Sequence, residues 1–425
     1  MRLSFSLLAF SVLCFSGVVF AEDVFRFRGD NSQGKFNETG LLDRWPEGGL
    51  TPKWVNGELG EGWSSVIKVR DRLYINCLDS SDSTKESLVC LDLNGKKIWQ
   101  QTTGTIWQGD HNSPRATPTF VAGEGVAGEW AADDKLVVLS GAGELFCLTA
   151  IHGDVLWHKD VARAYETRYG HWGFAESVVA KDGKVFVTVG GKKALAVAYH
   201  IADGSVAWET EPLDDKCAFL SQVLYENKLI VMTSSYISII DGETGQLLSK
   251  RDFHEDTGGA PKPEDAGNHC NPSLIKGDHI FAASTRGQGG VMYKILPDGK
   301  GLEKLWVTKA FDPHHHGMVE VDGRIYGSTS RDRWCCLDWE TGEMIYEETW
   351  GNLGKGVTLF ADGKMFLYEE KRGTLAIAKP SDKFEVVSSF RVDIGTKEHW
   401  AHPIISDGVL YVRRGISLAA FDIAQ

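Results

Sequence analysis

Short runs of alternating apolar residues recur along the chain, and each run is divided by a turn of Asp, Asn or Gly. Eight such units are "VRDRLYI", "ADDKLVV", "KDGKVFV", "YENKLIV", "KGDHIFA", "VDGRIYG", "ADGKMFL" and "SDGVLYV". Their turn residues are Asp71, Asp134, Asp182, Asn227, Asp278, Asp322, Asp362 and Asp407. Alternating β-branched and aromatic residues on both sides of an Asp-Gly-type turn are typical of a β-hairpin. The pattern therefore predicts eight hairpins.

A second hairpin pattern follows most of these units. It appears as "VCLDLNGKKIW", "FCLTAIHGDVLW", "VAYHIADGSVAW", "SIIDGETGQLLS" and "CCLDWETGEMIY", in which two strands flank a glycine turn and the second often ends in Trp. Each unit thus contains four strands, A to D. Repeated four-stranded antiparallel sheets without a long helical period predict an all-β protein, an eight-bladed β-propeller.

The last unit predicts how the ring closes. "WAHPIISDGVLYVRRGISLAAFDIAQ" supplies strands A to C and ends at Gln425 without a D strand. Near the N-terminus, "TPKWVNG" contains Trp54, which resembles the tryptophans at the ends of the D strands. We therefore expect Lys53 to Val55 to complete blade 8 and remove an open sheet edge. Residues 22–425 are predicted to form one propeller domain, with 22–56 as the N-terminal segment that carries the closing strand.

The first residues have the pattern of a secretory signal peptide. Arg2 precedes an apolar run from Leu7 to Phe20, and Ala21 precedes the acidic pair Glu22-Asp23. We expect cleavage near Ala21, a leader of residues 1–21, and a periplasmic or extracellular mature protein. Seven of the eight cysteines remain after cleavage, and an odd count in so long a chain is not a disulfide framework.

The charge excludes several classes of partner. The formal net charge is −13, and removal of the leader makes it one unit more negative. An acidic protein repels nucleic-acid phosphates and anionic lipids, so we expect neither nucleic-acid binding nor membrane insertion. The remaining candidates are a protein, peptide or saccharide ligand at the loop face of a monomer.

The repeats resemble a known family. The second hairpin looks like degenerate copies of the "ALDxxTGxxxW" repeat of quinoprotein (PQQ) dehydrogenases and of the BamB-like propeller of the outer-membrane protein assembly machinery. The segments "FRGDNSQGKFNETGLLDRWPEGGLTPKW" and "SPRATPTF" further resemble exported bacterial PQQ-like propeller proteins. The resemblance covers essentially the whole mature chain and implies the propeller fold.

For chemistry, the resemblance implies PQQ as a cofactor and a disulfide between Cys335 and Cys336, as in some quinoprotein dehydrogenases. A Trp platform with a Glu, Asn and Asp calcium set cannot be mapped onto this sequence residue by residue. In addition, alignment of the repeats places Cys336 in the column of Cys90, Cys147, Ala198 and Ala420, which we interpret as a small buried position.

Histidines recur directly before strand A of several blades, in "DHNSPRATP", "YGHWGFAES", "NHCNPS", "DPHHHGM" and "HWAHP". Loops that lead from strand D to the next strand A converge on one mouth of a propeller channel, so these side chains are expected to share a site. Glu176 is expected inside strand A, where it faces the channel and needs a partner. The ligand-binding candidates are His111, Asn112, Arg115, His171, Trp172, Glu176, His269, Asn271, His315 and His399.

The run His314, His315 and His316 is also a candidate metal site. Successive residues of an extended chain point to opposite sides, so at most two of these imidazoles are expected to face one ion. The alternative is a polar loop whose imidazoles cap strands and hydrogen-bond backbone carbonyls. Because we expect the loop to be solvated, replacement of all three histidines by Ala is predicted to leave folding nearly intact and to abolish binding.

Three function classes remain open: a non-catalytic binding or scaffold propeller, a PQQ-dependent oxidoreductase, and a metal-assisted enzyme that uses the channel-mouth histidines. The sequence contains no nucleophile motif and no phosphate loop, which favours the first class. Neither PQQ nor a metal is assigned from the sequence.

Overall fold

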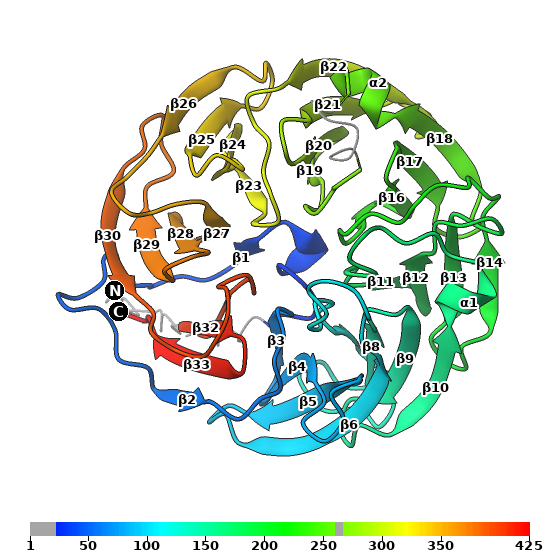
Figure 1. The fold of residues 1–425 in the computed structure, drawn as a ribbon, viewed down its shortest axis with the longest axis horizontal. Coiled ribbons are helices and arrows are strands. Elements are labelled where there is room, and N and C mark those ends of the chain that lie inside the picture. Colours follow the sequence, from blue (N-terminus) through cyan, green and yellow to red (C-terminus); the bar gives the residue numbers. More distant parts are fainter. Residues whose placement is uncertain (1–22, 260–266) are drawn as a thin grey trace, which may run out of the picture.

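Eight sheets form a ring around a central axis (Figure 1). The computed structural model describes residues 23–259 and 267–425, and these residues form the eight sheets. The fold is the predicted eight-bladed β-propeller. The predicted signal peptide, residues 1–21, lies outside the described residues.

In each blade four strands run antiparallel, with strand A nearest the axis and strand D at the rim (Figure 1). Blades 1 to 4 comprise β3 (Val66–Val69), β4 (Arg72–Leu78), β5 (Lys85–Asp92), β6 (Lys97–Thr105); β7 (Thr119–Val121), β8 (Lys135–Leu139), β9 (Glu144–Thr149), β10 (Val155–Asp160); β11 (Val179–Lys181), β12 (Lys184–Thr188), β13 (Ala196–His200), β14 (Val206–Glu209); β15 (Val223–Tyr225), β16 (Lys228–Met232), β17 (Tyr236–Asp241) and β18 (Leu247–Asp252).

Blades 5 to 8 comprise β19 (Leu274–Lys276), β20 (His279–Ser284), β21 (Gly289–Ile295), β22 (Leu302–Thr308); β23 (Met318–Val321), β24 (Arg324–Ser328), β25 (Trp334–Asp338), β26 (Met344–Glu348); β27 (Gly356–Ala361), β28 (Lys364–Glu369), β29 (Thr374–Ala378), β30 (Val386–Arg391); β31 (Ile404–Ser406), β32 (Val409–Arg414), β33 (Ser417–Asp422) and β2 (Trp54–Asn56). Two short helices, α1 (Val161–Ala164) and α2 (Phe253–Thr257), follow D strands. No helix in the described part of the chain is long and apolar enough to cross a bilayer.

The Asp-Gly turns between strands A and B have the backbone that the sequence predicted. Asp182 and Gly183, which join β11 to β12, have φ values of 49° and 72°. Positive φ at both central residues defines the type I′ turn, whose twist matches that of the flanking strands. Asp supplies a residue that tolerates this conformation and Gly one that adopts it without strain.

A repeated tryptophan contact joins neighbouring blades. The indole of a D strand lies over a glycine in the turn between strands C and D of the next blade, and its Nε1 donates to a carbonyl there. Trp99, for example, donates to the Ile151 carbonyl over 3.0 Å, and a Cβ on Gly153 would come within 2.7 Å of its ring. The same contact joins Trp54 to Gly95, Trp157 to Gly204, Trp208 to Gly245 and Trp306 to Gly342. The Trp of one repeat therefore packs on the Gly of the next repeat, and this contact joins the two blades.

The ring closes as predicted. Strand β2 pairs antiparallel with β33, with Trp54 opposite Ala420 and Val55 opposite Ala419. The observed strand begins one residue after the predicted Lys53. This pairing covers the outer edge of β33 and gives blade 8 its fourth strand.

The N-terminal segment also fills the centre of the ring, which the sequence did not predict. The short strand β1 (Lys35–Phe36) lies inside the ring and adds in parallel to β27 of blade 7 (Figure 1). Arg28, 1 % exposed, donates to the carbonyls of Met318 and Thr358 over 2.8 and 3.2 Å. Burial lowers the pKa of Arg28 to about 9. One buried arginine thus ties the segment to blades 6 and 7.

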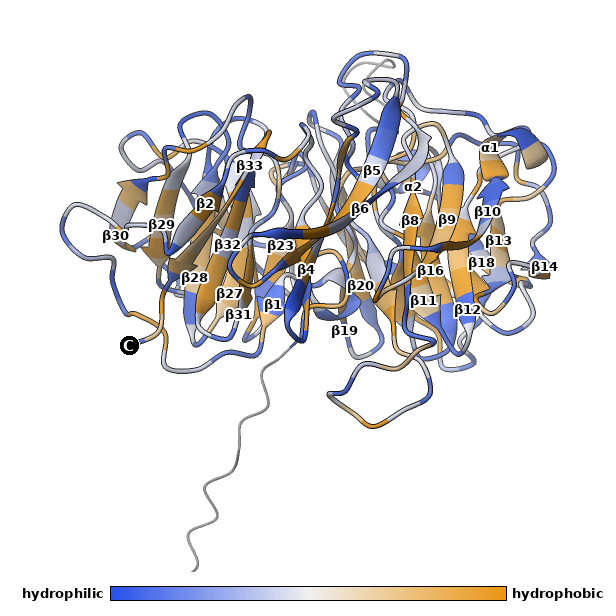
Figure 2. Cartoon of the chain, turned by 90° about the horizontal axis from the view of Figure 1, so that it is seen from below, coloured by the Kyte–Doolittle hydropathy of each residue, from blue (hydrophilic) through white to orange (hydrophobic). Residues whose placement is uncertain are grey.

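Apolar residues fill the strands, and polar residues concentrate in the loops at the two faces of the ring (Figure 2). Cys336 is fully buried and lies opposite Tyr326 and Tyr346 on the adjacent strands. It occupies the same column as Cys90, which lies opposite Tyr74 and Trp99. Small residues in this column leave room for the large aromatic neighbours. Cys335 and Cys336 are both free thiols.

Candidate functional site

A cavity of about 350 Å³ opens among the loops that connect strand D to strand A and strand B to strand C. We call it the mouth cavity. Its volume is at the lower end of the range for small-molecule pockets. It is lined by Phe27, Trp63, His111, Arg115, Trp172, Ala175, Ser177, Phe219, Leu220, Ser221, Cys270, Arg286, His314, His315, Trp400 and His402.

Five of the predicted site residues line the mouth cavity, although they come from blades far apart in the sequence. They are His111, Arg115, Trp172, His314 and His315. His111 and Asn112 are exposed, and the His111 ring lies 5.4 Å from that of Trp400. His171 points into solvent, with 69 % of its side chain exposed, and its Nε2 lies 3.3 Å from an oxygen of Asp110.

Two predicted histidines do not share this mouth. His269 is fully buried, its Nε2 lies 3.0 Å from the Ser234 carbonyl, and burial lowers its pKa to about 4. His399 is 1 % exposed, hydrogen-bonds the Tyr368 hydroxyl, and has its pKa lowered to about 3, also by burial. Both imidazoles are buried and neither lines the mouth cavity, so the prediction that they join His111 and His171 in one site is wrong.

Glu176 is also not where the sequence placed it. Strand A of blade 3 begins at Val179, so Glu176 precedes the strand. It is 2 % exposed, does not line the mouth cavity, and accepts hydrogen bonds from the amide and hydroxyl of Thr188 over 3.0 and 3.3 Å. Thr188 is the partner that its burial requires. Burial raises the pKa of Glu176 to about 8.

Asn271 holds the histidine loop in place. Its amide group donates to the carbonyls of Pro313 and His314, and its oxygen accepts the amide of Gly317 over 2.8 Å. These bonds fix the loop at both of its ends. Asn271 therefore positions the neighbouring histidines and does not itself line the mouth cavity.

The expectation that at most two of the three consecutive histidines could face one point is wrong. The ring centroids of His314, His315 and His316 lie 4.2 to 5.8 Å apart. The alternation of side chains holds only for extended backbone. Here the chain bends at His315 and His316, before β23, and turns through Gly317 with φ of 74°.

The expectation of a solvated loop is wrong as well. His316 is fully buried, and the His315 side chain is only 22 % exposed. Burial lowers the pKa of all three imidazoles, and their mutual repulsion adds to this effect for His314 and His315. At neutral pH these rings are therefore uncharged, with a free nitrogen lone pair on each.

The sequence reasoning missed several residues of this region because it considered only the loops between strands D and A. In an antiparallel blade the turns between strands B and C emerge on the same face. Arg286 lies in such a turn of blade 5, and Glu370 lies in the corresponding turn of blade 7. Glu370 Oε2 lies 3.0 Å from His316 Nε2. This topological rule was available from the repeat alone.

The walls of the mouth cavity are aromatic and its charged groups are cationic. Trp63 and Trp400 lie 4.9 Å apart, and Trp172 lies 5.1 Å from Phe219. Arg115 and Arg286 are lining residues, and no described lining residue is Asp or Glu. Burial lowers the pKa of Arg115 to about 10, so it remains charged at neutral pH. The Nε of Arg115 is buried without a hydrogen-bond partner.

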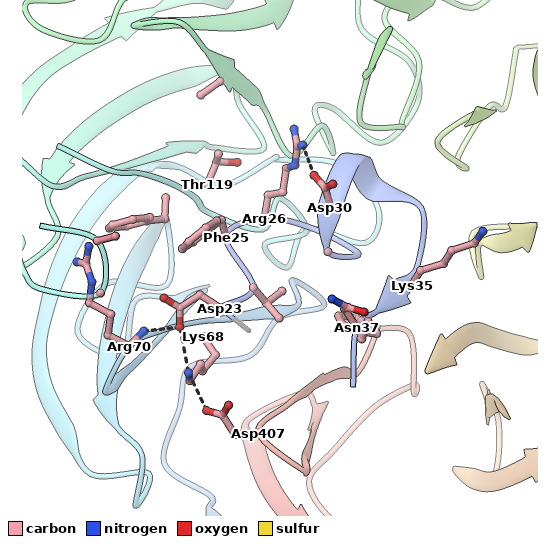
Figure 3. A pocket seen from close by; sticks show the side chains of 17 residues that line it. Asp23, Phe25, Arg26, Asp30, Lys35, Asn37, Lys68, Arg70, Thr119 and Asp407 are labelled. Carbon is pink, nitrogen blue, oxygen red and sulfur yellow. Dashed lines mark hydrogen bonds and ion pairs between the residues drawn. The ribbon is translucent and has the colours of Figure 1, made fainter. Parts of the chain in front are cut away.

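A second hollow, of about 920 Å³, lies on the opposite face, around the N-terminal segment (Figure 3). Its charged side chains are held in ion pairs. Lys68 lies 3.0 Å from Asp23 and 2.8 Å from Asp407, and Arg26 lies 3.1 Å from Asp30. This network anchors the start of the segment to blades 1 and 8, which favours a structural role for the hollow.

The fold and the repeated Trp-Gly contact define a propeller of the PQQ-like repeat class. The model of the family "Outer membrane protein assembly factor BamB" matches residues 84–348. The chain belongs to this family. No curated protein matches the sequence significantly.

Solved structures with the same fold include a BamB protein and several dehydrogenases. BamB from Moraxella catarrhalis has a TM-score of 0.61 at 12 % identity, over 88 % of this chain and 99 % of its own. Quinohemoprotein alcohol dehydrogenase from Comamonas testosteroni has a TM-score of 0.61 at 13 % identity, over 95 % and 80 %. A europium-containing methanol dehydrogenase has a TM-score of 0.61 at 10 % identity, over 92 % and 89 %. Identities this low show the shared fold alone.

The residues of the mouth cavity do not fit the quinone and calcium set that the resemblance to quinoprotein dehydrogenases implies. Calcium takes oxygen ligands, chiefly carboxylates. No described residue lining the cavity is acidic, and neither Cys335 nor Cys336 reaches it. We therefore derive no redox step for this chain.

Proposed function

We propose that this protein is an exported binding propeller that holds a small acidic ring compound, such as the end of an acidic saccharide, in the mouth cavity. The observation that carries this proposal is the pair Arg115 and Arg286 within aromatic walls that include no described carboxylate. Guanidinium groups recognise carboxylates through paired hydrogen bonds.

The indoles supply flat apolar surface to the walls of the cavity. Trp172 lies against Phe219, and the Trp400 ring lies 4.9 Å from Trp63 and 5.0 Å from the His315 ring. Few polar groups at defined positions within an apolar wall are typical of small-molecule sites. The buried, unpartnered Nε of Arg115 supports a ligand that brings its own acceptor.

The negative charge of the rest of the protein favours binding of an anionic ligand at the mouth cavity over binding elsewhere on the surface. The protein as a whole is acidic, with a formal net charge of −13, so an anion is repelled from most of the surface. The apolar run of residues 7–20 supports export to the periplasm or beyond, where saccharides of the envelope are available. We propose that the protein acts there as a monomer.

Binding is tested by intrinsic tryptophan fluorescence and calorimetry with galacturonate oligomers and, in parallel, their neutral galactose counterparts. We expect the acidic oligomer to bind at least about 10-fold more tightly, and Arg115→Gln to remove this preference. Arg168→Gln is the matched control, because Arg168 is an exposed arginine of a nearby junction that pairs with Asp214. Equal affinity for both oligomers, or equal losses in both variants, would contradict the proposal.

A further inference from the structure

Four potential metal-binding side chains from two blades meet beside the mouth cavity. His314, His315 and His316 precede β23 of blade 6, and Glu370 follows β28 of blade 7. One donor atom from each of the four lies within 4.8 Å of the donor atoms of the other three. Small shifts bring donors at this spacing to the distances of about 2.0–2.2 Å from a common ion that imidazole nitrogens and carboxylate oxygens adopt.

Side chains from three other elements hold this cluster in place. Asn271 of blade 5 binds the loop on both sides of the histidines. His402 of blade 8 donates from Nε2 to the His315 carbonyl over 2.9 Å, and its Nδ1 accepts from Arg28 over 2.9 Å. A side chain at Gly317 would strike the Arg28 guanidinium, with a Cβ contact of 2.0 Å. Supporting contacts of this kind orient metal ligands in known sites.

Several nitrogens of the cluster are buried without a protein partner. They are Nδ1 of His314, Nε2 of His315 and Nδ1 of His316. His316 is fully buried, so water does not readily supply the missing contact. A buried polar atom without a partner destabilises the fold, and a bound ion would remove part of this cost.

The carboxylate is already directed toward the imidazoles. Oε2 of Glu370 lies 3.0 Å from His316 Nε2 and 3.8 Å from His315 Nε2, and it accepts the indole N–H of Trp400 over 3.2 Å. Its other oxygen, Oε1, lies 3.4 Å from Lys355 Nζ. Lys355 and Trp400 therefore orient the carboxylate while Oε2 remains on the side of the histidines.

The geometry points to a divalent transition-metal site formed by His314, His315, His316 and Glu370. Three imidazoles and one carboxylate suit zinc and its neighbours among the first-row metals, whereas calcium and magnesium prefer oxygen ligands throughout. On binding, the hydrogen bond between His316 and Glu370 is replaced by one bond from each residue to the ion, and the single ring proton of the neutral His316 stays on the ring nitrogen that does not bind the ion. Because His314 and His315 also line the mouth cavity, an anionic ligand there would reach the ion; this last clause alone rests on the proposed function.

The test uses tag-free mature protein, stripped with EDTA and titrated with zinc and, separately, cobalt(II), in the absence of any organic ligand. We expect one ion per chain by elemental analysis and a visible cobalt(II) absorption of a site with nitrogen ligands. Glu370→Gln preserves size and should weaken zinc binding about 10-fold or more. His171→Ala removes an exposed histidine outside the cluster and should leave affinity unchanged.

Melting curves of the stripped proteins separate loss of fold from loss of binding, and the wild-type titration does not depend on any variant. Absence of a cobalt(II) or zinc site in the folded wild type overturns the inference, as does full zinc affinity in folded Glu370→Gln. Displacement of zinc by equimolar calcium would also overturn it. Since no saccharide is present, these outcomes are independent of the result for the mouth cavity.

Discussion

At the scale of single residues, burial decides how the titratable groups behave. His316 and Glu176 are both almost inaccessible, yet the first meets a carboxylate and the second meets only Thr188. An isolated carboxyl in such surroundings is stabilised in its protonated form. At neutral pH the Glu176 carboxyl is therefore mostly protonated, whereas the Glu370 carboxylate beside His316 is charged.

Glu176 should make the stability of the protein depend on pH. Its folded-state pKa of about 8 exceeds the ordinary value of 4.5, so the folded chain binds a proton that the unfolded chain has lost between these values. Stability from this group is complete below pH 4.5 and declines up to pH 8, by at most about 1.4 kcal/mol per pH unit. Glu176→Gln keeps an acceptor for Thr188 and should flatten this decline.

The measurement is urea unfolding of both proteins between pH 5 and 8.5. The variant should become the more stable protein toward the upper end of the range. Parallel stability curves would show that Glu176 is ionised in the folded protein at neutral pH.

At the scale of the elements, the contact between a D-strand tryptophan and a turn glycine holds neighbouring blades together. Each Trp fills the space that the missing Cβ leaves, and its N–H satisfies a turn carbonyl. The glycine therefore has two physical reasons to be there: a positive φ and a close indole. These reasons can be separated by experiment.

Gly153→Ala and Gly183→Ala form a matched pair for this purpose. Both glycines have similar positive φ values, 77° and 72°. A Cβ at Gly183 meets nothing within 4 Å, whereas at Gly153 it comes within 2.7 Å of the Trp99 ring. We expect Gly183→Ala to cost about 1–2 kcal/mol from backbone strain, and Gly153→Ala roughly 1–3 kcal/mol more from the clash. Thermal and urea unfolding measure both, and equal losses would mean that the indole simply moves away.

At the scale of the whole molecule, the N-terminal segment has two separate tasks. Its strand β2 closes the ring on β33, and its earlier part, with Arg28 and β1, fills the channel. The first task protects a sheet edge, and the second buries polar groups at the axis. Two deletions of different length distinguish them.

Deletion of residues 23–37 should lower the melting temperature but leave a monomer, because β2 still covers the edge of β33. Deletion of residues 23–56 exposes that edge and should give aggregates or higher oligomers. Size-exclusion chromatography with light scattering measures the oligomeric state of both deletion variants, and thermal unfolding measures their melting temperatures. A monomeric 23–56 deletion with an unchanged melting temperature would contradict closure by β2.

The sequence by itself determined the fold, since the hairpin periodicity acts over a few residues and recurs in the eight sheets of the described chain, and turn glycines and rim tryptophans mark most of these units. It also placed Trp54 in blade 8, because an incomplete last repeat requires a fourth strand. The hairpins and turns are local features, and the closing strand follows from counting the strands. The observed closing strand differs from the predicted one only by a shift of one residue.

Only the tertiary structure decided which polar residues meet. His269 and His399 occur in the same kind of junction as His111, yet they are buried in packing contacts. The convergence of three adjacent histidines depends on a bend fixed by Asn271 from another blade, and Glu370 arrives from a turn 54 residues after His316. Side-chain direction at a loop is set by contacts between blades, and such contacts leave no periodic trace in the sequence.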